Sequence, residues 1–177
     1  MGKILFADQD GVQVLKFEGD VRVCLGPTIS SFLNCIDKNR GINAVVIDLR
    51  ETTGIDSTSL GLLAKISIRS QDKLKVLPTI VSTNEDITRV LLSMGFDKIF
   101  VVDSKTPRCC AELGCDQLGE LPAEVVSEAA LRQQVLEAHR TLMQLNDNNL
   151  VAFKDLVAAL EQEQESSRVP PRLRANG

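Results

Sequence analysis

The segment that most constrains the fold is a short apolar run followed by a polar turn and a helical pattern. Residues 44–49 are mostly apolar and β-branched, which predicts a buried strand. From Leu60 to Ile68 the apolar side chains recur at helical spacing, which predicts a helix over about 57–70. The hydroxyl-rich residues 54–59 connect the two. This order is typical of a sheet built from strand–helix–strand units.

The polar turn places acceptor side chains at the start of the predicted helix. The first backbone N–H groups of a helix have no partner within it, and either Asp56 or Ser57 can cap them. These N–H groups and the positive end of the helix dipole also favour added anionic charge. A phosphoryl group on Ser57 would therefore be held on a rigid element, where a binding partner could detect it.

The first hundred residues continue this alternation, in the predicted order β-β-α-β-α-β-α-β. Residues 21–25 form either a short strand or an extended loop, and Pro78 indicates an edge strand or a bulge. The expected fold is α/β, a small mixed sheet that is mostly parallel, with an antiparallel N-terminal hairpin at its edge and helices beside it. The predicted strands are 3–8, 11–18, 44–49, 75–81 and 97–102, and the helices follow Thr28, Asp56 and Asn84.

The composition changes after residue 103. Residues 104–117 are predicted to be a linker, 118–165 a helical extension and 166–177 a flexible tail, after a first domain of residues 1–103. Two antiparallel helices joined at 146–149, or one long helix, would explain the pattern of the extension. Its apolar stripe needs cover from the first domain, from a helical mate or from another chain. The stripe has heptad-like spacing, at Leu131, Val135, Ala138, Leu142 and Leu145, then Leu150, Phe153, Val157 and Leu160.

The polar turn also carries a family resemblance. Asp56-Ser57-Thr58-Ser59-Leu60-Gly61 resembles the signature of STAS domains, in particular bacterial anti-sigma factor antagonists, whose usual pattern is Asp-Ser-Ser/Thr-Gly/Ala-Leu-Gly. The resemblance covers roughly residues 1–103 and implies the STAS fold. It departs at Ser59, where the family commonly has Gly or Ala. It departs again at Gly19-Asp20-Val21-Arg22, where Arg22 replaces a second carboxylate.

The resemblance implies a cytoplasmic bacterial signalling protein that controls transcription by partner switching. Ser57, or less favourably Thr58, would accept a phosphoryl group from a serine kinase, often the anti-sigma factor itself, and a PP2C-type serine phosphatase would remove it. The unmodified form would bind the anti-sigma factor. The rim of the binding surface is predicted at Asp20, Arg22, Asp56, Thr58 and Ser59.

Other classes of function are disfavoured. The single histidine, His139, lies more than eighty positions from Ser57 and is predicted on a helix surface, so a catalytic Ser-His pair is not expected. The sequence lacks a Gly-x-Ser-x-Gly elbow and a phosphate-binding glycine loop, so we expect neither an enzyme nor a cofactor site. The five cysteines are expected to be reduced thiols and not metal ligands.

Composition argues against nucleic acid and membrane partners. The net charge is −4, and Trp and Tyr are absent, so neither a basic surface nor stacking platforms are expected. Apolar runs fall short of the roughly 18–20 residues that span a bilayer. Two alternatives to the switched antagonist remain at this point. One is a scaffold that assembles through residues 122–164, and the other is a STAS domain that binds a nucleotide or another small ligand.

Overall fold

The computed structural model describes residues 1–38, 40–105, 107 and 117–168, and these contain a six-stranded sheet in the order β5-β4-β3-β2-β1-β6. Strand β2 pairs in parallel with β3, β3 with β4, and β4 with β5, whereas β1 pairs antiparallel with β2 and with β6. The strands are β1 (Lys3–Gln9), β2 (Val12–Val21), β3 (Ala44–Ile55), β4 (Thr79–Val81), β5 (Val101–Asp103) and β6 (Gly119–Glu120).

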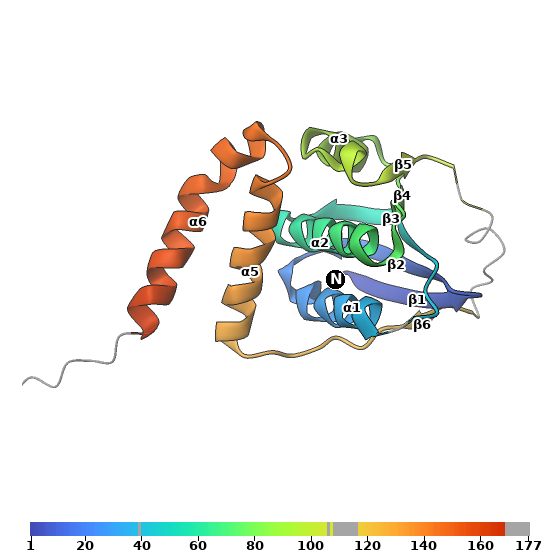
Figure 1. Ribbon diagram of the computed structural model, residues 1–177, viewed down its shortest axis with the longest axis horizontal. Coiled ribbons are helices and arrows are strands. Elements are labelled where there is room, and N and C mark those ends of the chain that lie inside the picture. The colour runs from blue at the N-terminus through green and yellow to red at the C-terminus, as the bar shows by residue number, and fades with distance from the viewer. Residues whose placement is uncertain (39, 106, 108–116, 169–177) are drawn as a thin grey trace, which may run out of the picture.

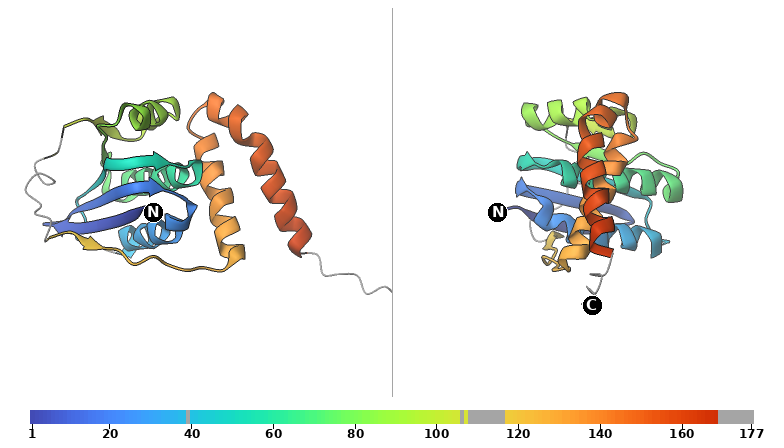
Figure 2. Two further views of the ribbon diagram at one scale, coloured as in Figure 1. Left: turned by 180° about the vertical axis from the view of Figure 1, so that it is seen from behind. Right: turned by 90° about the vertical axis from the view of Figure 1, so that its left-hand side faces the viewer.

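The helices follow the expected order along the first domain. They are α1 (Gly26–Lys38), α2 (Ser57–Leu74) and α3 (Glu85–Ser93), with short 3-10 turns η1 (Val23–Leu25) and η2 (Phe96–Lys98). Helices α1 and α2 lie on one face of the sheet (Figures 1 and 2). The predicted mixed α/β sheet with an N-terminal hairpin and the order β-β-α-β-α-β-α-β are therefore confirmed.

Four details differ from the sequence-based expectation. The strands predicted at 75–81 and 97–102 are shortened to β4 and β5, and residues 96–98 form the 3-10 turn η2. Strand β4 is internal, between β3 and β5, so the edge position predicted from Pro78 is wrong. Pro78 precedes the strand, where its carbonyl accepts a hydrogen bond from the Val101 amide at 3.0 Å and its missing N–H costs no ladder bond. The hairpin is not the edge either, because residues 119–120 add β6 beside β1. Residues 23–25 form a 3-10 turn instead of a strand or an extended loop.

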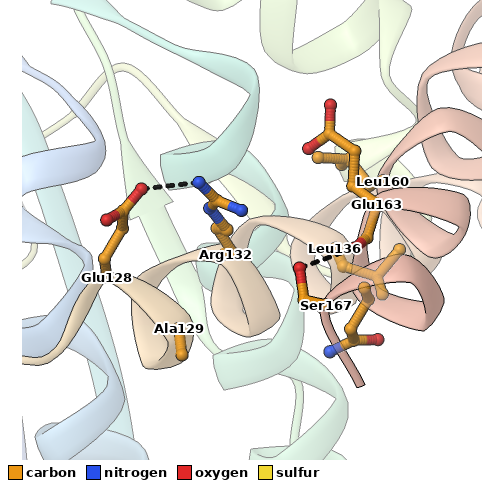
Figure 3. A pocket seen from close by; sticks show the side chains of 8 residues that line it. Glu128, Ala129, Arg132, Leu136, Leu160, Glu163 and Ser167 are labelled. Carbon is orange, nitrogen blue, oxygen red and sulfur yellow. Dashed lines mark hydrogen bonds and ion pairs between the residues drawn. The ribbon is translucent and has the colours of Figure 1, made fainter. Parts of the chain in front are cut away.

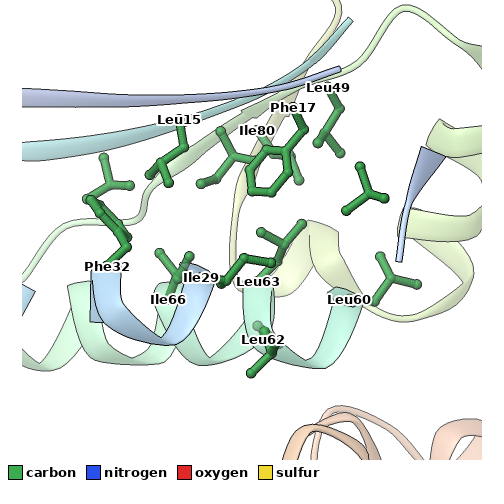
Figure 4. Close-up of a cluster of buried hydrophobic side chains, with 14 of the residues drawn as sticks. Leu15, Phe17, Ile29, Phe32, Leu49, Leu60, Leu62, Leu63, Ile66 and Ile80 are labelled. Carbon is green, nitrogen blue, oxygen red and sulfur yellow. The ribbon is translucent and has the colours of Figure 1, made fainter. Parts of the chain in front are cut away.

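The main core lies between the sheet and the helices. Strands β2 and β3 contribute fully buried side chains such as Leu15, Phe17 and Ile47, and α2 contributes Leu63 and others (Figure 4). Leu62, also fully buried, points away from the sheet, on the opposite side of α2. Helix α2 therefore buries two faces, which requires a further element to cover its outer side.

That further element comes from the C-terminal part of the chain. Helix α5 (Glu128–Met143) packs against α2, and α6 (Asp147–Arg168) then doubles back along α5 (Figure 1). Of the two patterns left open by the sequence, the structure shows two helices, and the Asn146 side chain caps the second by accepting a hydrogen bond from the Asn149 amide at 2.8 Å. Ala138 and Leu142 of α5 belong to the main core. Among the described residues, no helix is long and apolar enough to cross a membrane.

The domain boundaries proposed from the sequence stay a prediction, although two observations bear on them. Residues 119–120, assigned to the helical extension, are part of the sheet, and α5 shares the core of the first domain. Most of the proposed linker, 104–117, and of the proposed tail, 166–177, lies outside the described residues, as do Cys109, Cys110 and Cys115.

Candidate functional site

The turn between β3 and α2 is held in place by one aspartate. Asp56 has extended backbone angles and is the N-cap of α2. One oxygen of its carboxylate accepts a hydrogen bond from the Ser59 amide at 2.8 Å, and the other accepts one from the Val23 amide at 2.6 Å. Of the two predicted caps, the structure therefore selects Asp56. Its carboxylate ties the start of α2 to the start of η1, so Ser57 sits on a doubly anchored turn.

Ser57 is the first residue of α2 and is half-buried. Its hydroxyl oxygen lies 2.8 Å from Nε2 of His139, which comes from α5. The other ring nitrogen of His139, Nδ1, lies 2.8 Å from the carbonyl oxygen of Val135. Because a carbonyl can only accept, Nδ1 carries a proton, and in the neutral ring Nε2 accepts the hydroxyl proton of Ser57.

The prediction that His139 lies on a helix surface is wrong. Its side chain is 2% exposed, and its ring makes an edge contact with Phe153 at a centroid distance of 5.2 Å. The signal that was missed is its spacing, four residues after Val135 and three before Leu142, which places it beside the apolar stripe of α5. The site therefore contains a residue that sequence reasoning assigned elsewhere.

Helix α5 lies directly over the first turns of α2. A Cβ atom on Gly61 would collide with the carbonyl oxygen of Ala138, so the two helices approach closely where neither has a bulky side chain. Thr58 and Ser59 are 6% and 0% exposed. Both residues, predicted for the rim of the binding surface, are thus buried in this arrangement of the chain, and their role in binding a partner stays a prediction.

The remaining predicted rim residues are accessible and lie together at the ends of β2 and β3. Arg22 donates from Nε to an oxygen of Asp20 at 2.8 Å, and the side chains are 55% and 43% exposed. Hydrogen bonding to Asp20 and its charge, with a smaller contribution from Asp56, raise the pKa of the Arg22 guanidinium. Asp20 pairs in register with Gly54, and a Cβ at Gly54 would lie 2.6 Å from Asp20 Oδ1. Because Gly54 has no side chain, the Asp20 carboxylate can lie against its backbone.

The Ser57–His139 pair differs from a hydrolytic serine site in what stands behind the histidine. In such sites a third polar group, usually a carboxylate, orients the base and stabilises its protonated form. Here the group that contacts Nδ1 of His139 is the backbone carbonyl of Val135, in the same helix. The geometry therefore supports a hydrogen bond between two helices more directly than it supports proton transfer during catalysis.

Two other kinds of ligand site bear on function, a metal centre and a groove between α5 and α6. Among the described residues, no group of three or more His, Cys, Asp or Glu side chains could hold a metal ion, and Cys24 and Cys35 are free and exposed. A groove of about 420 Å³ opens between α5 and α6 (Figure 3). Its polar side chains are largely engaged, as Arg132 binds Glu128 at 2.6 Å and the Ser167 hydroxyl donates to the Glu163 carbonyl. Ser57 is not part of its lining.

Comparison with solved structures shows which known proteins share this fold. An anti-sigma factor antagonist from Mycobacterium paratuberculosis superposes with a TM-score of 0.50 at 22% identity, over 59% of this chain and 87% of that one. A putative anti-sigma factor antagonist from Thermotoga maritima gives a TM-score of 0.52 at 22% identity, over 60% of this chain and 91% of the other. Among curated proteins, no significant sequence match is found.

The sequence comparison agrees with the structural one. The profile of the STAS domain family matches residues 4–108, which is more than half of the chain, from β1 to beyond β5. Helices α5 and α6 lie outside the matched residues. Residues Asp56 to Gly61 lie within the matched range, with Asp56 just after β3 and Ser57 to Gly61 at the start of α2. This chain belongs to the STAS domain family.

Proposed function

We propose that this protein is an anti-sigma factor antagonist, a non-enzymatic binding protein of the bacterial cytoplasm that is switched by phosphorylation of Ser57. The unmodified form binds an anti-sigma factor or serine kinase, phosphorylation releases that partner, and a PP2C-type serine phosphatase restores binding. The observation that carries this proposal is the position of Ser57 on the first turn of α2, anchored through Asp56. The two solved structures with the same fold are described as an antagonist and a putative antagonist of anti-sigma factors.

The physical effect of phosphorylation at this position is large. A phosphoserine carries about −1.5 to −2 charges at neutral pH. It would stand on the residue after Asp56, three residues after Gly54, which lies against Asp20. A partner packed on this surface would meet added volume, like charge and the cost of removing water from a dianion. A loss of about 1–3 kcal/mol lowers the binding constant roughly 5- to 150-fold.

The first test is detection of the modification in cells. Phosphopeptide mass spectrometry of the protein from its own cells should find phosphate on Ser57. The signal should vanish on treatment with a PP2C-type phosphatase and in the Ser57→Ala variant. Ser93→Ala is the matched control, because Ser93 is an exposed serine of the same domain that lies at the end of α3, not at the start of a helix. Absence of phosphate from Ser57 under every growth condition would refute the switch.

The second test measures binding. Ser57→Ala mimics the unmodified state and Ser57→Asp adds a negative charge, so affinity purification of the two variants should recover different partners. An anti-sigma factor or serine kinase is expected with Ser57→Ala and should be depleted by at least about tenfold with Ser57→Asp. Identical partner sets from both variants would contradict the proposal even if phosphate were found.

A second candidate function, a scaffold that assembles through α6, is favoured by one observation. Leu150, Val151 and Leu156 are 45%, 66% and 42% exposed on this helix. Large apolar side chains that stay exposed on a helix are candidates for contacts between chains. Sedimentation equilibrium would test this function. If α6 is an assembly surface, the wild type should form oligomers, and Val151→Glu should shift them to monomer without change in the circular dichroism spectrum.

A further inference from the structure

The surface around Ser57 is already covered by a helix of the same chain. Nε2 of His139 in α5 lies 2.8 Å from the Ser57 hydroxyl oxygen, and Ala138 lies against Gly61 one turn further along α2. Between them, Thr58 is 6% exposed. Ser57, Thr58 and Gly61 are three of the six residues of the family signature. A protein that docks on the start of α2 would need the space that α5 fills.

Beside its apolar contacts, helix α5 is tied to several parts of the domain by hydrogen bonds. Near its start, Gln134 donates to the Gly26 carbonyl at 3.1 Å, at the beginning of α1. In its middle, Glu137 accepts a hydrogen bond from Lys65 of α2 at 2.7 Å. In the first turn of α6, the buried Asn149 donates to the Met94 carbonyl at 3.0 Å, just after α3. These contacts hold α5 across one end of the domain (Figure 2).

We propose that α5 is an internal cover of the Ser57 surface, which competes with any partner that binds there and which responds to Ser57 through His139. The inference rests on the proposed function, because the covered surface is the one proposed to bind the anti-sigma factor. The inference adds that, in the unmodified chain, α5 already occupies part of the surface proposed to bind the partner. The helical extension then sets how readily the domain accepts a partner.

The contact between Ser57 and His139 makes the cover sensitive to modification. Their side chains are 2.8 Å apart, so no phosphoryl group fits between them while α5 stays docked. His139 is 2% exposed and packs against Phe153, and Ala138 already touches Gly61, so α5 has little room to adjust. Phosphorylation of Ser57 should therefore loosen α5 from α2. The volume and charge of the phosphoryl group would also obstruct a partner directly. Loosening of α5 and obstruction of a partner are therefore two distinct effects of the same modification.

The first experiment measures access to residue 57 in the purified full-length chain. Ser57→Cys is labelled with N-ethylmaleimide and followed by peptide mass spectrometry, with the exposed Cys24 and Cys35 as internal references. A second substitution, Ala138→Glu, places a charged side chain at a residue of α5 that is 0% exposed. It should open the cover and raise the labelling rate at position 57 roughly tenfold. Ala152→Glu, at an exposed alanine of α6, is the matched control and should change nothing.

Equal labelling rates in the Ala138→Glu and Ala152→Glu backgrounds would overturn the proposal. Hydrogen exchange of β2 and β3 shows whether the sheet stays folded in each variant. If Ala138→Glu unfolds the sheet, Asn149→Ala replaces it, because this variant removes the anchor to α3 at a distance from Ser57. It should raise the labelling rate about threefold or more, and an unchanged rate would overturn the proposal in the same way.

The second experiment tests the response to modification. Phosphoserine is incorporated at position 57 by genetic code expansion, and hydrogen exchange is compared with the unmodified chain. Amides of α5 should exchange about tenfold faster with phosphoserine, while those of β2 and β3 stay unchanged. Unchanged or slower exchange in α5 would overturn the response through His139. Both experiments use the purified chain alone, so their failure leaves the search for phosphate in cells unaffected, and the reverse also holds.

Discussion

Helices α5 and α6 have similar sequence patterns but different surroundings. In α5, Leu136, Ala138, His139 and Leu142 are all 2% exposed or less, and two of them belong to the main core. In α6, Asn149 and Val157 are the side chains with less than a tenth of their surface exposed, within the described range. Helix α6 contacts α5 and leaves Leu150, Val151 and Leu156 exposed.

The difference shows that an apolar stripe does not indicate its partner. Helix α5 has small side chains where it meets α2, above all Ala138 opposite Gly61, and this permits a close approach of the two backbones. Helix α6 meets a single helix, so it can bury one narrow stripe at most. The part of the extension that covers the polar turn is thus built into the domain, and the outer helix is an addition to it. Four predictions test this contrast.

The largest effect is expected from a leucine on each helix. Leu142→Ala removes a side chain that is 0% exposed in the main core and should lower the free energy of unfolding by about 2–5 kcal/mol. Leu156→Ala removes one that is 42% exposed and should cost less than about 1 kcal/mol. Equilibrium unfolding in urea gives both values. Similar costs for the two would mean that α5 is no more a part of the core than α6.

The next effect concerns the first turn of α6. The side chain of Asn149 donates to the carbonyls of Met94 and Leu142 at 3.0 and 2.9 Å. Asn149→Ala leaves both without this donor and should destabilise the chain by roughly 1–3 kcal/mol. The exposed neighbour Asn148 is the control, and Asn148→Ala should stay within about 0.5 kcal/mol of the wild type. Equal losses would show that the anchor to α3 contributes nothing specific.

A smaller effect is expected from the hydrogen bond between Ser57 and His139. A double-mutant cycle with Ser57→Ala and His139→Ala should give a coupling of about 0.5–1.5 kcal/mol in the free energy of unfolding. The same cycle between Ser57→Ala and Glu161→Gln should give none, because Glu161 lies on α6 and binds Arg140. A coupling of zero in the first cycle would remove His139 as the link between the two helices.

The smallest effect is a pH dependence carried by Glu137 of α5. Hydrogen bonds from Gln133 and from Lys65 hold the pKa of this carboxyl below its ordinary value of 4.5. Its contribution to stability is therefore present above about pH 4.5 and is lost as the pH falls through the lower pKa of the folded state.

Because the Glu137 side chain is 41% exposed, this contribution should stay below about 1 kcal/mol. Lys65→Gln should reduce the loss of stability between about pH 5 and 3, measured by urea unfolding at each pH. Lys154→Gln, an exposed lysine of α6, should leave the pH profile unchanged. A Lys65→Gln profile that matches the wild type would show that the ion pair to α5 is without effect.

Much of the fold followed from local sequence patterns, because caps and strand periods act over a few residues. Asn84 caps α3 by accepting hydrogen bonds from the amides of Asp86 and Ile87, as its place before two acids predicts. Gly95 follows α3 with φ of 84°, the left-handed conformation that a glycine at a helix end adopts. Asp56 and Ser57 were placed at a strand-to-helix turn for the same reason, and the turn is there.

What the tertiary structure decided lies between residues far apart in the chain. The sequence by itself determined the sheet, the helix order, the polar turn and the apolar stripe of α5. It did not determine that this stripe would cover the polar turn, that His139 would meet Ser57 across 82 positions, or that residues 119–120 would extend the sheet. The physical reason is that apolar faces are interchangeable in a sequence pattern. Shape alone, here the fit of Ala138 against Gly61, selects which two faces meet.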